Sequence, residues 1–374
     1  MEYGVFSTAF SARDIDGIAA GLEANNIRKT QFYPLIAGKQ LFAADFTDSL
    51  IRNINRTFAG HGVSIVAVGA GNRFISSDEE EAKKALENAL RWIETAPRLG
   101  ANIIVTEAGT AHKTKFWTDV PENHSAETWA RIVEIYRTLA RRAQDYGVTV
   151  GIEPHFASGV RDAKELRGVL DDVGEPNFKA VLDPANSVTV ENADRQEETL
   201  AELFTLLGGD FVLAHAKDAR LENGATVFGP AGSGVLPYGA YLTLLKTAGY
   251  GGPLLLEYVG EDFQDVIRYI KLSTAPPFLK PIAQADPALY DAIQRVQDIH
   301  HGDTGVIPKK YRLLLSVVAD ALALHPAGTA ACAREALKAG AAKEEIIEAL
   351  RVVYAAGGLP PLLESADVYR ELMP

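Results

Sequence analysis

Eight short apolar runs alternate with amphipathic segments along the chain up to about residue 270. The runs are rich in Val, Leu, Ile and Phe and are bounded by Gly, Pro or Asn, which is typical of buried parallel strands. They lie near residues 3–8, 30–34, 63–69, 102–107, 148–153, 178–183, 211–216 and 253–257. Between the runs, apolar residues recur with the helical period, as over 15–22, 82–99, 126–145 and 238–248. Strict alternation of strand and helix, repeated eight times, predicts a (β/α)8 barrel.

An open, doubly wound sheet is the alternative architecture for such alternation. That fold commonly carries a Gly-x-Gly-x-x-Gly turn after its first strand, and no such motif follows residues 3–8. Eight units are also more than an open sheet usually needs. The α/β barrel is therefore the predicted fold of residues 1–275.

The alternation stops after Ile270. Residues 276–287 are rich in proline, which cannot continue a helix, and we expect this segment to be a linker. From 288 to 374, apolar residues recur only with helical spacing, and Gly340 is a plausible C-cap. The sequence thus predicts a small all-α domain after the barrel.

The composition limits the partners of the protein. Its 374 residues carry a formal charge of −12, with a pI near 5.2 and no basic run, whereas nucleic-acid-binding proteins cluster Lys and Arg against phosphates. The single cysteine, Cys332, excludes an internal disulfide and is typical of a reducing compartment. The start of the chain does not resemble a secretory leader, and no run of about 18 apolar residues occurs. We expect a cytoplasmic protein with no nucleic-acid or membrane partner.

A carboxylate or an imidazole ends each of four successive predicted strands, at Glu153, Asp183, His215 and Glu257. Parallel strands of a barrel all end at one rim, so these side chains are expected to converge there. One acid after one strand is most often a helix cap or a loop residue, but four in consecutive units favour a site. Three carboxylates and one imidazole suit one divalent metal ion, such as Mn, Mg, Co or Zn.

Such a metal would acidify the α-proton of a bound hydroxy-carbonyl compound by stabilising the enediolate. Glu153 and Glu257, on opposite sides of the metal, would remove and return the proton, which gives epimerisation or aldose–ketose isomerisation. The same enediolate can instead expel a β-hydroxyl group, so an inosose-type dehydratase is the nearest alternative. A catalytically silent barrel that serves as a binding or scaffold protein is the third.

Further residues near these strand ends are candidates for binding the substrate. Glu107 ends the fourth strand and is expected to contact substrate or to orient Lys217. Trp117, in the loop that follows, either stacks on a sugar face or packs over the barrel rim. His155 either holds a substrate hydroxyl or caps a helix. Lys217 either binds an anionic substrate oxygen or forms a salt bridge with Asp218 or a neighbouring carboxylate.

The strings around the four positions resemble the xylose isomerase-like barrel superfamily of sugar-phosphate isomerases and epimerases, over about residues 1–275. The matching strings are Gly151-Ile152-Glu153-Pro154-His155, Leu182-Asp183-Pro184-Ala185-Asn186, His215-Ala216-Lys217-Asp218 and Leu256-Glu257-Tyr258. The resemblance implies that Glu153, Asp183, His215 and Glu257 are metal ligands, and that the two glutamates are also the acid–base pair. The superfamily includes a DNA-repair endonuclease, but the acidic charge disfavours that activity here.

Two departures from that family concern the substrate. Many ketose epimerases carry a histidine where this chain has Asn186, so hydrogen bonding to the substrate there must differ. Their arginine after the histidine ligand is not clearly matched, because Arg220 stands one residue early. The expected substrate is therefore a sugar or polyol derivative, with no closer definition.

The segment 302–372 resembles the carboxymuconolactone decarboxylase and alkylhydroperoxidase D superfamily, on residues 333–341 and 344–350. Redox members of that superfamily need a Cys-x-x-Cys pair followed by a histidine. The aligned positions here hold His325, Gly328 and Cys332, and the upstream relay glutamate is replaced by apolar residues 313–315. One thiol cannot form the internal disulfide of the peroxidase cycle. We therefore expect a non-redox domain for packing or assembly, and a homo-oligomer formed through it.

Overall fold

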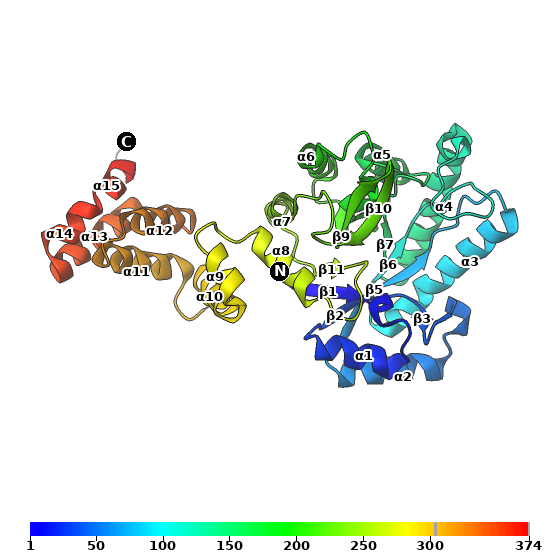
Figure 1. Ribbon diagram of the computed structural model, residues 1–374, viewed down its shortest axis with the longest axis horizontal. Coiled ribbons are helices and arrows are strands. Elements are labelled where there is room, and N and C mark those ends of the chain that lie inside the picture. Colours follow the sequence, from blue (N-terminus) through cyan, green and yellow to red (C-terminus); the bar gives the residue numbers. More distant parts are fainter. Residues whose placement is uncertain (303–304, 373–374) are drawn as a thin grey trace. The chain divides into compact units, whose positions relative to one another are not determined.

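The computed structural model describes residues 1–302 and 305–372, and the chain divides into two compact units that meet in sequence at Thr274 and Ala275 (Figure 1). Of the predicted helical domain 288–374, residues 303–304 and 373–374 lie outside the described residues. Each unit has its own apolar core. Within the described residues, no helix combines the length and the apolar character needed to cross a membrane.

Eight parallel strands close into a barrel in the first unit, with helices around them (Figure 1). In chain order they are β1 (Tyr3–Phe6), β2 (Lys29–Phe32), β5 (Ser64–Gly71), β6 (Ile103–Thr106), β7 (Thr149–Ile152), β8 (Phe178–Leu182), β9 (Phe211–Glu222) and β11 (Leu254–Leu256). Each pairs with the next, and β11 pairs with β1, where Leu256 lies opposite Val5. The predicted (β/α)8 barrel is confirmed.

The alternation of side chains along the strands aims the candidate ligands into the barrel. Val181, Leu213 and Leu255 belong to a buried cluster made of strand residues from around the ring, which places it inside the barrel. Successive strand residues face opposite sides, so residues two positions further on face the interior again. Those residues are Asp183, His215 and Glu257.

On β7, the inward-facing residue two positions before Glu153 is Gly151. A Cβ at this position would lie 2.7 Å from Val181 Cγ2 and 3.3 Å from the carbonyl oxygen of Ile104. The barrel interior therefore has no room for a side chain here, and glycine lets β7 pack closely against its neighbours.

The helices that cover the barrel are α1 (Ile15–Ala24), α2 (Asp48–Gly60), α3 (Glu79–Thr95), α4 (Ala126–Gln144), α5 (Ala163–Val173), α6 (Gln196–Leu207), α7 (Tyr238–Thr247) and α8 (Gln264–Ser273). Five of them begin after an N-cap side chain that accepts a backbone N–H, at Asp14, Thr47, Asp78, Ser125 and Asp162. Each such cap stabilises its helix by about 1 kcal/mol. Short polar residues thus start five of the eight helices that cover the barrel.

Two hairpins were not predicted. Strands β3 (Leu35–Ile36) and β4 (Lys39–Gln40) form one, and β9 continues past the rim to pair with β10 (Ala225–Pro230) as the other. The second turns at Asn223-Gly224, where both φ angles are positive, at 51° and 78°. Asn-Gly is a strong signal for such a turn, so this hairpin could have been found in the sequence. It matters because it brings Phe228 over the candidate site.

The second unit is all-helical. Its helices are α9 (Lys280–Ala285), α10 (Pro287–His301), α11 (Lys309–Leu322), α12 (Pro326–Lys338), α13 (Lys343–Gly357), α14 (Leu359–Glu364) and α15 (Ala366–Leu372). Apolar residues of α11 and α13, among them Val317, Ile346 and Leu350, are fully buried in its core. The prediction of an all-α region after the barrel is confirmed.

The proline-rich segment 276–287 differs from the expectation of a non-helical linker, because it contains α9. Pro281 occupies the first turn of α9, and Pro287 is the first residue of α10. Proline breaks a helix interior but is tolerated in the first turn, where its missing N–H has no helical partner anyway. These prolines therefore start helices, and the role of the segment as a linker stays a prediction.

Candidate metal centre

The four predicted ligands come together at the carboxyl end of the barrel. Glu153, Asp183 and Glu257 directly follow β7, β8 and β11, and His215 lies within β9. One ligand atom from each lies within 4.8 Å of the others. Glu153, Asp183 and His215 are buried, and Glu257 is partly exposed. The four side chains therefore form one small, mostly buried donor cluster.

Unpaired atoms at the centre of this cluster fit a bound cation. Within the described residues, Asp183 Oδ1 and His215 Nδ1 are buried without a hydrogen-bond partner. His215 Nδ1 lies 3.5 Å from Glu153 Oε2 and 3.6 Å from Asp183 Oδ2. Leaving buried polar atoms unpaired is costly, so an ion that all of them contact would stabilise the arrangement. Oxygen and imidazole donors at this spacing suit a divalent metal.

Gln31, on β2, sets the orientation of the histidine. His215 Nε2 lies 3.0 Å from Gln31 Oε1, and because an amide oxygen only accepts, Nε2 must donate. His215 Nδ1 is thereby turned toward the carboxylates. Burial would lower the pKa of His215, but Glu153 and Asp183 raise it to about 10, so without metal a proton occupies Nδ1. A hydrogen bond of this kind fixes the ring of metal-binding histidines.

Lys217 is buried beside the same carboxylates. Its Nζ lies 2.8 Å from Glu257 Oε2, 2.9 Å from Asp183 Oδ2 and 3.9 Å from Glu153 Oε1. Burial alone would lower the pKa of Lys217, but these three carboxylates raise it well above its usual value. Of the two predicted alternatives, the salt bridge to neighbouring carboxylates is present. Asp218 instead accepts backbone N–H groups, including that of Leu236 at 3.0 Å.

The charges of the cluster balance when a divalent ion is included. Three carboxylates carry three negative charges, the Lys217 ammonium offsets one, and a divalent cation would offset the other two. Buried charges are costly unless they are compensated in this way. Lys217 and a metal are therefore compatible in one site, with the ammonium beside the cation position.

Two glutamates have pKa values suited to proton transfer near neutral pH. Burial raises the pKa of Glu257 to about 8, although Lys217 opposes the shift. Burial and the nearby Glu153 raise the pKa of Glu107 to about 7, opposed by a hydrogen bond from Trp117. Perturbed carboxyl groups of this kind gather at catalytic sites.

Asn186 contacts a candidate base in this structure. It lies in the 3-10 turn Pro184–Ser187 that follows Asp183, and its Nδ2 donates to Glu153 Oε1 at 2.6 Å. The amide therefore holds one carboxylate oxygen of Glu153, while the other faces His215. Its predicted contact with substrate stays a prediction.

His155 is neutral and lies at the wall of the site. Its Nδ1 accepts the backbone N–H of Ala157 at 3.1 Å, so it caps a tight turn and not a helix. Burial, with the Lys217 charge as a second cause, lowers the pKa of His155 to about 3. In the neutral ring with Nδ1 as acceptor, Nε2 carries the proton and is a hydrogen-bond donor.

Trp117 both packs on the rim and remains accessible. Its ring stacks on His155 with centroids 5.9 Å apart, and its Nε1 donates to Glu107 Oε2 at 2.9 Å. The residue is 52% exposed. Glu107 therefore contacts Trp117. Among the described residues, Glu107 has no hydrogen bond to Lys217, so the prediction that Glu107 orients Lys217 has no support here.

One cavity of about 1490 Å³ joins these groups. Its lining includes most of the predicted site residues, namely Glu107, Trp117, Glu153, His155, Asn186, Lys217 and Glu257. Sequence reasoning missed many of the other lining residues, among them Tyr33, Arg73, Phe228 and Tyr258. The rings of Phe228 and Tyr258 lie 5.0 and 5.4 Å from Lys217 Nζ, which screens the ammonium from water.

Comparison with known proteins places the chain in a family. Residues 27–277, more than half of the chain, match the family model of the xylose isomerase-like TIM barrel. The chain belongs to the xylose isomerase-like TIM barrel family. Residues 287–371 match the carboxymuconolactone decarboxylase family. No curated protein matches the chain.

Solved structures share the barrel at low identity. A 3-keto-D-glucoside 4-epimerase from E. coli is 17% identical with a TM-score of 0.57, over 72% of this chain and 99% of its own. A xylose isomerase-like protein from Mycobacterium smegmatis in complex with magnesium is 17% identical with a TM-score of 0.55, over 73% and 98%. A probable 3-DHS dehydratase from Bacillus anthracis is 16% identical with a TM-score of 0.55, over 74% and 99%. These likenesses establish the fold.

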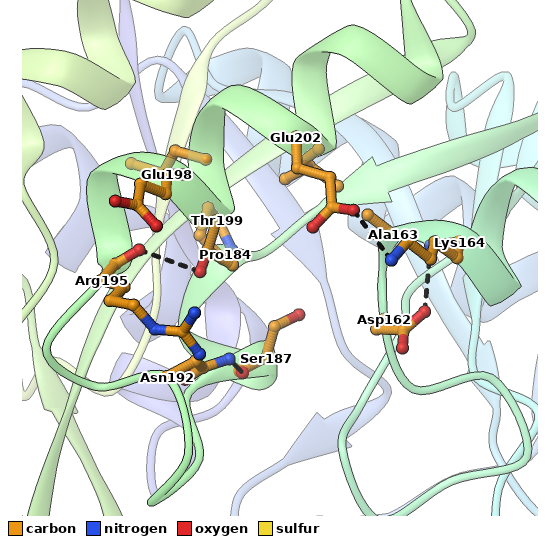
Figure 2. Close-up of a pocket in the computed structure, with 12 residues that line it drawn as sticks. Asp162, Ala163, Lys164, Pro184, Ser187, Asn192, Arg195, Glu198, Thr199 and Glu202 are labelled. Atoms are coloured by element: carbon orange, nitrogen blue, oxygen red, sulfur yellow. Dashed lines mark hydrogen bonds and ion pairs between the residues drawn. The ribbon is translucent and has the colours of Figure 1, made fainter.

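A second pocket in this xylose isomerase-like barrel is smaller, at about 250 Å³, and lies against α5 and α6. Figure 2 shows Lys164 and Glu202 on one side of it and Arg195 with Asn192 on the other. Lys164 Nζ and Glu202 Oε1 form an ion pair at 3.2 Å. None of the predicted site residues lines this pocket, whereas seven of them line the larger cavity.

The cysteine of the carboxymuconolactone decarboxylase-like unit is held as a thiol. Cys332 is partly buried, and its Sγ lies 3.5 Å from Asp320 Oδ2. Burial and the Asp320 carboxylate raise the pKa of Cys332 to about 11. A reactive cysteine needs a lowered pKa, so this environment supports the expectation of a non-redox domain.

Proposed function

We propose that this protein is a divalent-metal-dependent isomerase or epimerase that acts on a sugar or polyol derivative. The observation that carries the proposal is the convergence of Glu153, Asp183, His215 and Glu257 within 4.8 Å of one another, with the two glutamates lining a large cavity. The low-identity similarity to an epimerase and to a magnesium complex is consistent with it.

The residues of the site divide the work of proton transfer. A divalent cation held by the four ligands would polarise a substrate carbonyl and an adjacent hydroxyl group, and so acidify the proton between them. Glu153, oriented by Asn186, removes a proton from one face of the substrate. Glu257, with a pKa near 8 in the metal-free site, returns a proton to the other face. The two glutamates are thus assigned the acid–base roles.

The wall of the cavity binds the substrate. The Lys217 ammonium offsets the negative charge that develops on a substrate oxygen. His155 Nε2 donates to a hydroxyl group, and the indole of Trp117 lies beside it as an apolar surface for a sugar ring. The aromatic residues around Lys217 limit access of water to the reacting atoms.

A dehydratase is the second candidate on the same site. It is favoured by the similarity of the barrel to the probable 3-DHS dehydratase. The first proton transfer is the same, and the reactions diverge only when a β-hydroxyl group leaves instead of a proton returning. A silent scaffold is the third candidate, and the complete set of ligands argues against it.

Hydrogen–deuterium exchange tests the proposal before the product is known. The metal-loaded protein is incubated in D2O with a panel of ketoses, inososes and keto-glycosides, and the C–H signals are followed by proton NMR. We expect loss of one signal next to a carbonyl group, abolished by a chelator and restored by Mn2+, Mg2+ or Co2+. A new alkene signal would assign the dehydratase. No exchange across the panel by fully metal-loaded protein would support the scaffold.

We further propose a cytoplasmic protein that binds no nucleic acid or membrane and that forms a homo-oligomer through its helical unit. The net charge of −12 supports the first part. Exposed apolar side chains on the helical unit, such as Val296 and Ile299 on α10, support the second.

A further inference from the structure

A loop between β6 and α4 lies against the cavity. Lys113, Thr114, Phe116 and Trp117 of this loop line the cavity, and the ends of the loop are set by β6 (Ile103–Thr106) and α4 (Ala126–Gln144). The loop has no helix or strand of its own over residues 107–120. Some other feature must therefore hold Trp117 in place beside His155 and Glu107.

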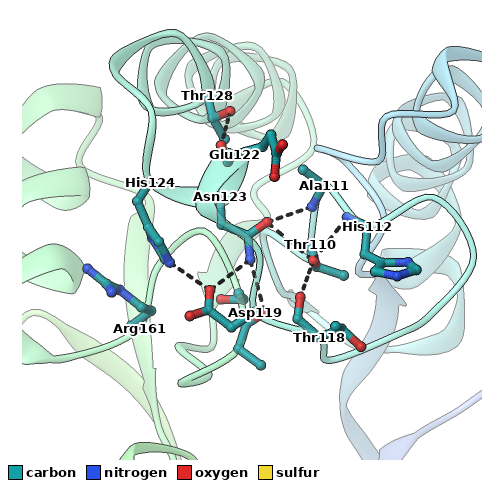
Figure 3. A network of polar contacts seen from close by, with 12 residues as sticks. Thr110, Ala111, His112, Thr118, Asp119, Glu122, Asn123, His124, Thr128 and Arg161 are labelled. Atoms are coloured by element: carbon teal, nitrogen blue, oxygen red, sulfur yellow. Dashed lines mark hydrogen bonds and ion pairs between the residues drawn. The ribbon is translucent and has the colours of Figure 1, made fainter.

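The first anchor is at the base of the loop. Asn123 Oδ1 accepts the backbone N–H of Ala111 at 2.7 Å and the hydroxyl of Thr110 at 3.2 Å. Figure 3 shows Asn123 between these residues and Asp119, whose Oδ1 also accepts from His124 Nε2 at 2.6 Å. This network ties the start of the loop to its end. Further along, His112 Nδ1 accepts the backbone N–H groups of Thr114 and Lys115 at 3.2 and 3.1 Å, but these two bonds lie within the loop itself.

The second anchor is Arg73, which lies in the loop after β5 and is only 6% exposed. Its guanidinium donates to the backbone carbonyls of His112 and Lys113, both at 3.1 Å, and of Lys115 at 3.3 Å. Its Cζ lies 4.9 Å from the centre of the Phe116 ring. One buried side chain thus contacts four of the five residues that precede Trp117.

Arg73 makes more contacts than a salt bridge to one carboxylate would need. Arg73 also pairs with Glu81 and donates to Ser76 Oγ at 3.0 Å, which fixes the guanidinium against the start of α3. A lysine could satisfy the carboxylate equally well. Only a planar group with several fixed donors can bridge three carbonyl groups and stack on a ring at the same time.

Trp117 needs such support because its backbone is strained. Its φ angle is +47°, in the left-handed region that L-residues with a side chain rarely adopt. An unanchored loop would leave this conformation readily, and the indole would lose its contacts with Glu107 and His155. The geometry points to a positioning function for Arg73, because Arg73 holds the loop and so opposes the loss of these contacts.

We propose that Arg73 is a positioning residue for the substrate-binding wall: it holds residues 112–116 so that Trp117 stands over the cavity with Nε1 on Glu107. Its effect on turnover rests on the proposed function, whereas its effect on the loop does not. Arg73 does not itself contact the reacting atoms, so it acts through Trp117.

Limited trypsin digestion tests the loop without any substrate. Trypsin cuts after Lys113 and Lys115, whose carbonyl groups are those that Arg73 binds. In Arg73→Met and Arg73→Lys, we expect cleavage at these two sites to be faster on the order of tenfold than in the parent. Arg142→Met is the matched control, because Arg142 pairs with Glu94 at 2.7 Å at the far end of α4.

Circular dichroism separates loop release from unfolding. If Arg73→Met loses its helical signal, Arg73→Lys decides the question, since it keeps a cation for Glu81. Equal resistance of Lys113 and Lys115 in Arg73→Lys, the parent and Arg142→Met would overturn the anchoring role. Faster cleavage at only these two sites, with an unchanged spectrum, is the supporting result.

A double-mutant cycle then tests the route through Trp117. We expect Arg73→Lys and Trp117→Phe each to raise KM for the exchange reaction more than they lower kcat. The double variant should lose no more activity than Trp117→Phe alone, because both changes remove the same interaction. Fully additive losses would overturn the assignment. If the parent shows no exchange at all, the proposed function fails, while the trypsin result still decides the anchoring.

Discussion

The two units of the chain treat buried polar groups in opposite ways. The barrel unit buries several ionisable side chains close together, including Glu153, Asp183, His215 and Lys217. In the helical unit, the buried polar side chains among the described residues are the neutral Thr329 and Ser365. Burying a charge costs on the order of several kcal/mol unless it is compensated, so a packed core avoids it. The contrast is consistent with our proposal that the reaction takes place in the barrel.

The surfaces of the two units differ as well. Large apolar side chains are exposed along several helices of the helical unit, such as Leu315 on α11, at 59%, and Leu363 on α14, at 62%. The most exposed aromatic residues of the barrel, in contrast, include Trp117 and Tyr258 at its cavity. This difference is consistent with our proposal that the barrel binds a substrate and that the helical unit contacts a second copy of the chain.

Removing one buried ligand should have the largest effect. In Asp183→Ala, metal occupancy after dialysis should fall from about one ion per chain to near zero, because the oxygens at the centre of the cluster are lost. Exchange activity should vanish with it. Metal analysis by mass spectrometry measures the occupancy.

Asp171→Ala is the control for this change, because Asp171 is an exposed carboxylate on α5 that pairs with Arg167 at the surface. Equal metal content in Asp183→Ala and the parent would contradict the metal site. Loss of metal in both variants would point to damage of the fold.

The acid–base glutamates come next. Glu153→Gln and Glu257→Gln keep the shape of the side chain but remove its ability to take a proton, so exchange should slow by at least about a hundredfold. The NMR exchange assay, run on metal-loaded protein, checks this. Glu202→Gln, on α6 at the smaller pocket, should exchange at the parental rate, because Glu202 does not line the larger cavity. A parental rate in either catalytic variant would leave that glutamate as a ligand only.

A charged residue on the exposed apolar surface tests the assembly role of the helical unit. Leu315→Glu should lower the mass of the particle in light scattering, because a carboxylate would be buried in the contact between copies. Val190→Glu is the matched control, since Val190 is an equally exposed apolar residue, at 57%, in the barrel unit. An unchanged mass in both variants would show that Leu315 does not lie in an interface between copies of the chain.

The smallest effect is expected at Cys332. Cys332→Ser should leave exchange activity and particle mass unchanged, because a thiol with a pKa of about 11 stays protonated near neutral pH. A raised pKa also lowers the thiolate fraction at pH 8, so alkylation by iodoacetamide should be roughly a hundredfold slower than for an ordinary thiol, and should speed up as the pH rises toward 11. Hydroperoxide reduction that disappears in Cys332→Ser would show a redox function after all.

The local pattern of apolar and polar residues was sufficient to predict the barrel and most of the helices. Short apolar runs bounded by turn residues became the eight strands of the barrel, and short polar residues such as Asp162 became helix caps. The hairpin of β9 and β10 was missed although its Asn223-Gly224 turn is a known signal. The helix α9 was missed because proline density alone does not separate a helix start from a linker.

The sequence by itself determined that Glu153, Asp183, His215 and Glu257 share one rim, because the strand period and the topology of a barrel leave no other arrangement. Only the tertiary structure decided what surrounds them. The partners Gln31 of His215 and Asn186 of Glu153 come from other strands or turns, and Arg73 reaches a loop some forty residues away. Such contacts join segments far apart in the chain, so no local pattern of residues can specify them.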